Sequence, residues 1–197
     1  MNCENDTLSK VKLAALTLFN QKGYTATTTR EIANEVGIKS STLYFYFKSK
    51  EEIFFTLYKE AMKLFEDKLQ ILLDKVKDKD VEKQLYICFR VLMEFFIDHN
   101  LYYRFIYRYL IHPVYGVQDK IKIEQEQWLN LTTRNIYELF YAGKEQGLFR
   151  NFSVDNLAKS FFRIQSGYIY ELILNDQIPS KEEIDEVWAT YWAGIKA

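Results

Sequence analysis

The stretch TTTREIANEVGIKSSTLYFYFKSKEEI, residues 27–53, decides how the first part of the chain folds. Thr28 followed three positions later by Glu31 is a capping box, which predicts that a short helix begins here. Ala33 is a small residue where a second helix can cross, and Gly37 supplies a turn. Two short helices joined by such a turn describe a helix-turn-helix, whose second helix enters the major groove of DNA.

The second of these helices has Leu43 and Phe47 four residues apart, which places both on its buried face. The remaining side chains present hydroxyl and cationic groups. Hydroxyls can bond base edges or phosphates, and cations neutralise phosphates. A three-helix cap with a solvated polar face would carry similar residues, so the pattern alone leaves that alternative open. The candidate DNA-contacting residues are Thr28, Arg30, Lys39, Ser40, Ser41, Thr42, Tyr44, Tyr46, Lys48 and Lys50.

Charge is distributed unevenly along the 197 residues, although the net charge is only −1. Through Lys50 there are seven Lys and Arg against four Asp and Glu, which gives +3, and the remainder carries −4. This asymmetry has the sign expected if the first quarter of the chain contacts phosphates, although a solvated surface could also produce it.

Hydrophobic periodicity predicts an all-α fold of about nine helices, because Gly and Pro are scarce and apolar residues recur at three- and four-residue spacing. Gly23 is positioned to end the first helix. Ser49 and Ser153 suit N-caps, and Ser180 with Glu183 forms a second capping box. The expected helices are 7–22, 28–36, 39–47, 49–77, 81–98, 101–112 (ended by Pro113), 118–146, 153–175 and 181–195.

Residues 14–53 resemble the DNA-binding domain of the TetR family of bacterial transcriptional regulators. The motifs that carry the resemblance are AALTLF (14–19), GYTATTTREIA (23–33), GI (37–38), TLYFYF (42–47) and SKEEI (49–53). The resemblance implies an N-terminal three-helix helix-turn-helix domain at 1–48. It also implies a C-terminal helical bundle for ligand binding and dimerisation at 49–197.

The same resemblance implies roles for individual residues. Thr28 would cap its helix and touch a phosphate, and Tyr44 and Lys50 would hold phosphates. Two residues depart from the family pattern: Lys39 stands where a capping Ser is usual, and Tyr46 where His is commonest. The residues implied to approach bases are Ser40, Ser41 and Thr42.

Aromatic residues are concentrated in the C-terminal three quarters of the chain. Most such side chains belong to cores and interfaces, and some line cavities for apolar or flat ligands. TetR-like proteins are generally released from DNA by a small molecule, so the resemblance favours a pocket. The candidate pocket residues are Phe89, Phe96, Tyr103, Tyr107, Trp128, Tyr137 and Phe162.

The last two helices carry the candidate dimer interface. Two tryptophans on one narrow stripe are a large apolar surface for a terminal helix, and aromatic residues are enriched in interface cores. The alternative is that this stripe docks on its own domain. The family dimerises through its last two long helices, so the resemblance favours the interface. The candidate residues are Ser166, Tyr170, Trp188, Tyr191 and Trp192.

Several classes of protein are not supported. No apolar run reaches the length of a membrane span, and no secretory signal begins the chain. Cys3 and Cys88 have no disulfide-framework spacing, which favours a reducing, cytoplasmic location. No catalytic or cofactor motif occurs, and His99 and His112 lack metal-ligand neighbours. We therefore expect no enzyme activity, metal or cofactor.

These observations predict a homodimeric transcriptional regulator that binds a palindromic operator in double-stranded DNA and is most simply a repressor. A small apolar or aromatic effector would release it. Two alternatives stay open. One is a TetR-like DNA-binding protein without a small-molecule effector, which responds to a protein partner or organises the chromosome. The other is a helical enzyme or ligand carrier with an inert DNA-binding head.

Overall fold

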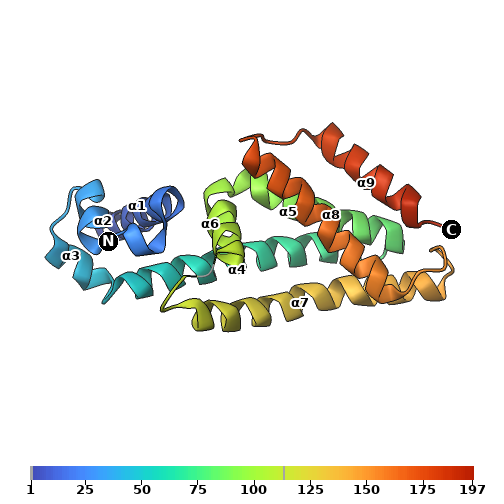
Figure 1. Cartoon of the computed structure of the whole chain (residues 1–197), viewed down its shortest axis with the longest axis horizontal. Coiled ribbons are helices and arrows are strands. Elements are labelled where there is room, and N and C mark those ends of the chain that lie inside the picture. Colours follow the sequence, from blue (N-terminus) through green and yellow to red (C-terminus); the bar gives the residue numbers. More distant parts are fainter. Residues whose placement is uncertain (1, 113) are drawn as a thin grey trace. The chain divides into compact units, whose positions relative to one another are not determined.

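The structure is a computed structural model that describes residues 2–112 and 114–197, without the side chains of 2–5, 125 and 127–132. Pro113 and the side chains of Cys3 and Trp128 therefore lie outside the described residues. The predicted all-α class is confirmed (Figure 1). In the described ranges the helices are α1 (Asn2–Ala26), α2 (Thr29–Val36), α3 (Ser40–Tyr46), α4 (Lys50–Val76), α5 (Val81–Asp98), α6 (Asn100–Ile111), α7 (Gln118–Glu145), α8 (Val154–Leu174) and α9 (Lys181–Ile195).

The caps expected from the sequence are present. Thr28 and Ser180 each accept a hydrogen bond from the backbone N–H of a glutamate that bonds back to them, as a capping box requires. Ser153 accepts from Asn156 N at the start of α8. The first helix differs from its predicted range, because it spans Asn2–Ala26. Gly23, with φ of 82°, interrupts the helical path and leaves one more turn after it.

The chain divides into two compact units. The first combines Met1–Lys63 with Asn100–Gln125, which differs from the predicted boundary after residue 48. Hydrogen bonds between α1 and α6 explain the difference. Asn20 Nδ2 donates to Leu101 O at 2.8 Å, and Arg108 Nη1 donates to Asn20 O at 3.0 Å. The helix-turn-helix therefore belongs to a unit that includes a helix much later in the chain.

Phe54 is the centre of the aromatic core of this first unit. Its side chain is fully buried on α4. Its ring centroid lies 5.7 Å from that of Phe19 on α1 and 5.0 and 4.8 Å from those of Phe105 and Tyr109 on α6. One side chain thus connects three helices, because aromatic pairs favour these tilted and edge-to-face arrangements.

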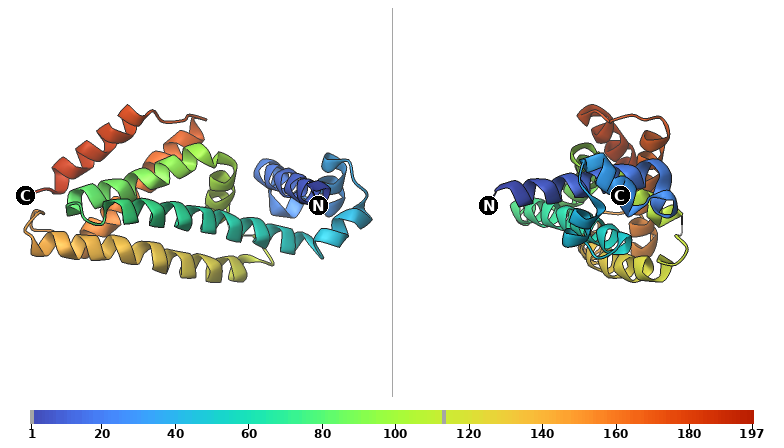
Figure 2. Two further views of the ribbon diagram at one scale, coloured as in Figure 1. Left: turned by 180° about the vertical axis from the view of Figure 1, so that it is seen from behind. Right: turned by 90° about the vertical axis from the view of Figure 1, so that its left-hand side faces the viewer.

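The second unit, Leu64–His99 with Glu126–Ala197, contains α5, α8 and α9, and α9 runs alongside α8 (Figures 1 and 2). Trp188 on α9 packs on Phe89 of α5, with ring centroids 5.6 Å apart. Cys88 is buried beside this core, and burial raises the pKa of its thiol to about 12. The cysteine is therefore part of the packing and is kept in its neutral form.

In the described parts of the chain, every helix is too short or too polar to cross a membrane.

Candidate nucleic-acid interface

Helices α2 and α3 form the predicted helix-turn-helix. Gly37 adopts a left-handed conformation with φ of 76°, and its N–H donates to the carbonyls of Ala33 and Asn34. The side chains of Ile32, Ala33 and Leu43 are fully buried. A small residue at position 33 and an αL glycine at position 37 therefore hold the two helices at their crossing, which fixes the direction of α3.

The outer face of α3 presents the side chains expected to meet base edges. Lys39, Ser41 and Thr42 are exposed and Ser40 is partly exposed. Lys39 is the N-cap residue, and its side chain makes no capping hydrogen bond. The helix start therefore keeps backbone N–H groups unpaired by a side chain, a site that favours anions such as phosphate.

Phe45 also lies on this face and was missed by the sequence analysis. Its side chain is 78% exposed on α3, and its ring meets that of the half-buried Tyr46 edge-on, with centroids 5.4 Å apart. An exposed phenylalanine can contact a thymine methyl group in the major groove. The position could have been found from its place between Tyr44 and Tyr46, opposite the buried face.

The first turn of α2 carries a second group of hydroxyls. Thr28 Oγ1 accepts from Glu31 N at 3.2 Å, and Thr28 N donates to Glu31 Oε2 at 2.9 Å. The hydroxyls of Thr29 and Tyr44 lie 3.2 Å apart, which joins the start of α2 to α3. Thr29 was not among the candidate DNA-contacting residues, although the run of three threonines at 27–29 could have indicated it. The hydroxyls of Thr29 and Tyr44 therefore lie at the N-terminus of α2, and a helix N-terminus favours the binding of a phosphate.

Glu31 is the acidic partner in this first turn. Its side chain accepts from Lys22 Nζ and from Thr28. The Lys22 ammonium first, and then the Thr28 hydroxyl and backbone, lower the pKa of Glu31 from 4.5 to about 2. Glu31 is therefore ionised in the folded protein at neutral pH. Its negative charge lies in the first turn of α2, where it interacts favourably with the positive end of the helix dipole.

A pH prediction follows from this lowered pKa. Because the folded-state pKa lies below the ordinary value, the contribution of Glu31 to stability is present above about pH 4.5 and is lost as the pH falls toward about 2. Glu31→Gln should lower the melting temperature at neutral pH. Between about pH 4.5 and 2 the melting temperature of this variant should then fall less than that of the wild type. The measurement is the melting temperature against pH. Glu35→Gln on the exposed surface of the same helix is the matched control, and an equal change in both variants would contradict the assignment.

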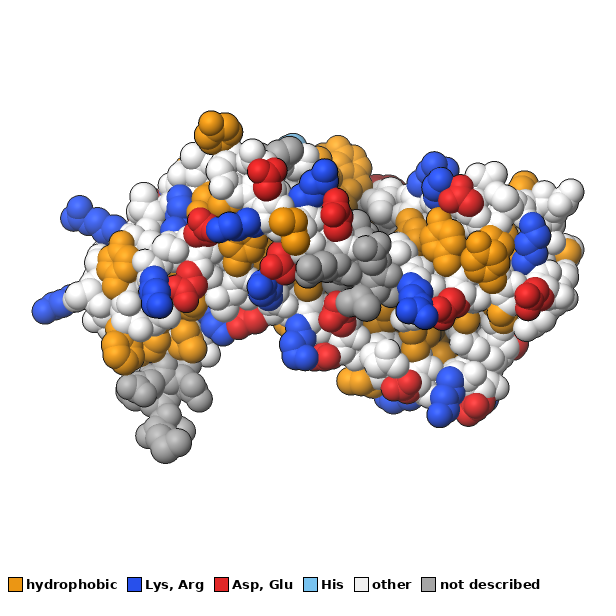
Figure 3. Space-filling view, turned by 90° about the horizontal axis from the view of Figure 1, so that it is seen from below, with side chains coloured by type: hydrophobic (Ala, Val, Ile, Leu, Met, Phe, Trp, Pro, Cys, Tyr) orange, Lys and Arg blue, Asp and Glu red, His pale blue; other side chains and the backbone are white. Residues whose placement is uncertain are grey.

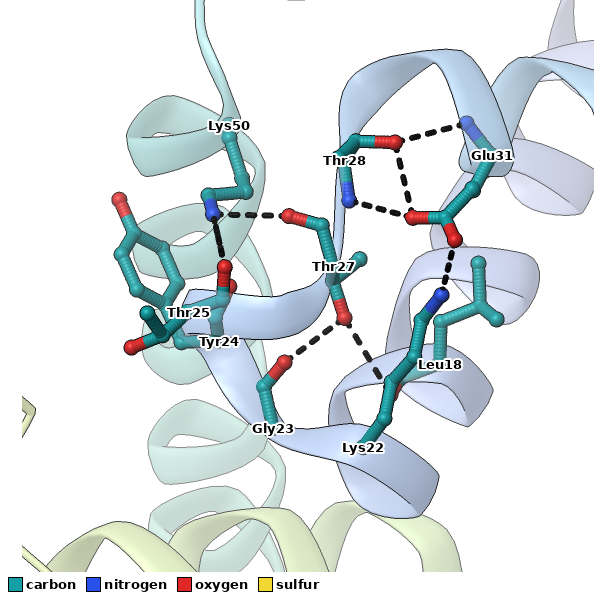
Figure 4. Close-up of polar contacts among 9 residues, drawn as sticks. All are labelled: Leu18, Lys22, Gly23, Tyr24, Thr25, Thr27, Thr28, Glu31 and Lys50. Atoms are coloured by element: carbon teal, nitrogen blue, oxygen red, sulfur yellow. Dashed lines mark hydrogen bonds and ion pairs between the residues drawn. The ribbon is translucent and has the colours of Figure 1, made fainter.

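Lys50, in the first turn of α4, does not extend into solvent. Its ammonium donates to the carbonyls of Tyr24 and Thr27, each at 2.7 Å, and lies 3.5 Å from the carbonyl of Thr25 (Figure 4). It also lies 4.3 Å from the centroid of the Tyr24 ring. Partial burial lowers the pKa of Lys50. The side chain expected to hold a phosphate thus contacts backbone instead.

Arg30 and Lys48, by contrast, are exposed. Figure 3 shows basic side chains projecting at the end of the N-terminal unit, whereas acidic and basic side chains are interspersed elsewhere on that face. Among the candidate DNA-contacting cations, Arg30, Lys39 and Lys48 thus have exposed side chains, whereas that of Lys50 is partly buried.

The candidate pocket residues fall in both units. In the first unit, Tyr103 is buried, and its ring stacks on that of Tyr107 with centroids 6.0 Å apart. In the second unit Phe89 and Phe96 are fully buried, Phe162 is half-buried, and Tyr137 OH donates to Asp155 Oδ1 at 3.2 Å. Phe89 and Phe96 are therefore core side chains in this structure.

The candidate interface residues separate by the direction in which they face. Trp188, Tyr191 and Trp192 are buried against their own domain: the ring of Trp192 meets Phe149, and that of Tyr191 meets Phe161. The aromatic stripe of α9 is thus docked on its own domain, the alternative named in the sequence analysis, because the rings of α5 and α8 accept it. Ser166 and Tyr170 on α8 are exposed.

Helices α8 and α9 border an open groove on the second unit, with a volume of about 780 Å³. Its apolar lining includes Leu157 and Ile164 from α8 and Val187 from α9. Arg163 and Glu186 also line it, one from each helix. The groove therefore combines an apolar strip with one charge of each sign.

Comparison with known proteins gives the following relationships. Residues 13–57 match the family described as bacterial regulatory proteins, tetR family. Over 71 residues the chain is 32% identical to the Fatty acid metabolism regulator protein of Bacillus subtilis (strain 168), a match that covers 36% of this chain and 35% of that protein. Over 86 residues it is 37% identical to the Biofilm operon icaADBC HTH-type negative transcriptional regulator IcaR of Staphylococcus aureus (strain Newman), covering 43% and 42% of the two proteins.

Among solved structures, the chain is similar to the ketosteroid transcriptional regulator KstR2 of Mycobacterium tuberculosis, with a TM-score of 0.75. The identity is 21%, and the match covers 100% of this chain and 97% of that one. This likeness concerns the fold. In sequence, the chain spans less than half the length of the curated relatives described above, 35% and 42%.

Proposed function

Because the chain carries a TetR-family DNA-binding domain at residues 13–57, we propose that it is a transcriptional repressor that binds a palindromic operator as a homodimer. The exposed outer face of α3 carries the proposal. It presents Ser41 and Thr42 to base edges, with Thr28, Thr29 and Tyr44 grouped at the start of α2 to hold a phosphate. Arg30, Lys39 and Lys48 supply the neighbouring charge, and Ser40 and Tyr46 stand at the edges of this face.

Dimerisation is proposed to use the groove between α8 and α9 as a two-fold interface. A two-fold interface places the same surface on both partners, so every contact between two different residues occurs twice. We propose that α8 of one copy lies against α9 of the other. Arg163 and Glu186 lie on opposite helices of the groove. Each arginine would then face the glutamate of the other copy, across an apolar centre that includes Val187. Tyr170 and Ser166, both exposed on α8, would lie in the same interface.

Charge reversal tests this arrangement. Arg163→Glu and Glu186→Arg should each weaken dimerisation about ten-fold, because like charges then face each other twice across the two-fold axis. An equimolar mixture of the two variants should form heterodimers, in which opposite charges meet again. The measurement is sedimentation over a concentration series. Lys159→Glu, which changes an exposed charge of α8 outside the groove lining, is the control. Equal dimerisation of all three variants would exclude the groove as the interface.

The effector is proposed to be a small apolar molecule bound in the helical C-terminal part of the chain. Two relatives support this class of ligand by their names, which refer to fatty acid metabolism and to ketosteroids. Such a ligand shifts the protein away from its DNA-binding state only by as much as it binds the other state better. Saturated fatty acids of defined length, added to the purified protein, should raise its melting temperature and release bound DNA. No shift with any of them would favour a regulator that lacks this effector.

The test of the whole proposal is selection of genomic fragments by the purified protein at physiological salt, followed by sequencing. The expected result is a palindrome with half-sites about 34–36 Å apart, or a multiple of one helical turn. Enrichment no greater than for unrelated DNA would contradict the proposal and would favour a ligand-binding protein with an inert head.

A further inference from the structure

The ammonium of Lys50 is directed at backbone carbonyls of its own unit. An ammonium carries three N–H groups. Two of them make short bonds to the carbonyls of Tyr24 and Thr27, and the carbonyl of Thr25 lies 3.5 Å from the same nitrogen. The Tyr24 ring covers the ammonium at 4.3 Å, where a cation is attracted to the aromatic face. To reach DNA, the side chain would have to break contacts that already satisfy it.

The carbonyls held by Lys50 belong to the turn that leads from α1 into α2. Gly23 interrupts α1 with a positive φ, and the fully buried Thr27 donates through its hydroxyl to Gly23 O at 2.8 Å (Figure 4). Thr28, the next residue, is the N-cap of α2. Lys50 therefore fixes, from α4, the turn whose last residue begins the first helix of the helix-turn-helix.

From this geometry we propose that Lys50 is a positioning residue for DNA binding and makes no phosphate contact. It holds the 24–27 turn, and through it the Thr28 and Thr29 hydroxyls, in the place where a phosphate meets the start of α2. This differs from the role that the family resemblance implies for the same lysine. The proposal rests on the proposed DNA-binding function.

Salt dependence separates the two roles. Each phosphate contact releases counterions, so removing one flattens the slope of log K against log salt by about 0.9. Removing a positioning residue weakens binding at every salt concentration and leaves the slope unchanged. Lys48 is the matched control, because it lies two residues away and its side chain is exposed.

The experiment compares Lys50→Met with Lys48→Met in the full chain, on the operator recovered by selection. Lys50→Met should lower the melting temperature by about 5 °C, because it leaves part-buried carbonyls without a donor. It should also weaken DNA binding about ten-fold with an unchanged salt slope. Lys48→Met should leave the melting temperature within about 1 °C and flatten the slope by about 0.9.

Two results overturn the proposal: a slope flattened by Lys50→Met as much as by Lys48→Met, or an unchanged melting temperature in Lys50→Met. If Lys50→Met does not fold, Lys50→Gln replaces it, since the amide keeps two N–H donors without the charge and the slope still decides. If the wild-type protein binds no operator, the proposed function fails. The melting temperatures then decide alone whether Lys50 holds the turn.

Discussion

Phe54→Ala is expected to destabilise the first unit by about 3–5 kcal/mol, the usual cost of removing a fully buried phenylalanine. The ring is fully buried and touches α1 through Phe19 and α6 through Phe105 and Tyr109. Truncation to alanine removes all of these contacts and leaves a cavity. Helices α1 and α6 cannot easily move to fill it, because hydrogen bonds also connect them to each other. The loss is comparable to a large part of the stability of a typical domain.

Thermal melting followed by circular dichroism measures the effect, which should be on the order of 10 °C. Phe45→Ala is the matched control, because the same side chain is 78% exposed on α3. It should leave the melting temperature within about 1–2 °C while it alters DNA binding. Similar melting temperatures for the two variants would mean that the Phe54 cluster does not hold the unit together.

Trp188→Ala is expected to cost the second unit about 3–5 kcal/mol as well. The indole ring packs against three other rings: its centroid is 5.6 Å from that of Phe89 and 5.7 Å from that of Tyr86, both on α5, and 5.4 Å from that of Trp192 on its own helix, α9. Because these contacts are internal to the unit, the loss should appear at every protein concentration.

An interface role for Trp188 predicts a different result. Removing an interface residue would shift the protein toward a folded monomer, and the melting temperature would then depend strongly on protein concentration. Denaturant unfolding at two concentrations separates the outcomes. Tyr141→Ala, which removes an aromatic ring that is 60% exposed on α7 and outside the proposed interface, is the control. It should leave the stability of the unit within about 0.5–1 kcal/mol.

Much of the fold could be predicted because its signals are local. The capping boxes at Thr28 and Ser180 and the glycine at position 37 act on their own helix ends, so short sequence patterns identify them. The buried faces of α2 and α3 follow from helical spacing, and Leu43 and Phe47 are buried as that spacing requires. The exposed hydroxyls and cations of the helix-turn-helix follow from the same spacing.

The remaining features depend on partners far away in the chain. Helical spacing groups Trp188 and Trp192 on one stripe but does not say whether that stripe meets its own domain or another copy. From the sequence, Lys50 is predicted to be an exposed cation like Lys48, because the carbonyls that bind it lie 23 to 26 residues earlier in the chain. Every residue has the same backbone carbonyl, whatever its side chain. The sequence therefore could not indicate which carbonyls accept hydrogen bonds from Lys50.

The pairing of α1 with α6 also bears on the order in which the protein forms during synthesis. Tyr109 OH donates to Phe19 O across 90 residues of chain, and α6 supplies Phe105 to the cluster around Phe54. Ribosomes add about 5–20 residues per second, so several seconds pass between the emergence of α1 and that of α6. Throughout that interval the apolar faces of α1 and α4 lack their covering helix. The helix-turn-helix, although it precedes α6 in the chain by more than 50 residues, gains its complete core only after α6 has been made.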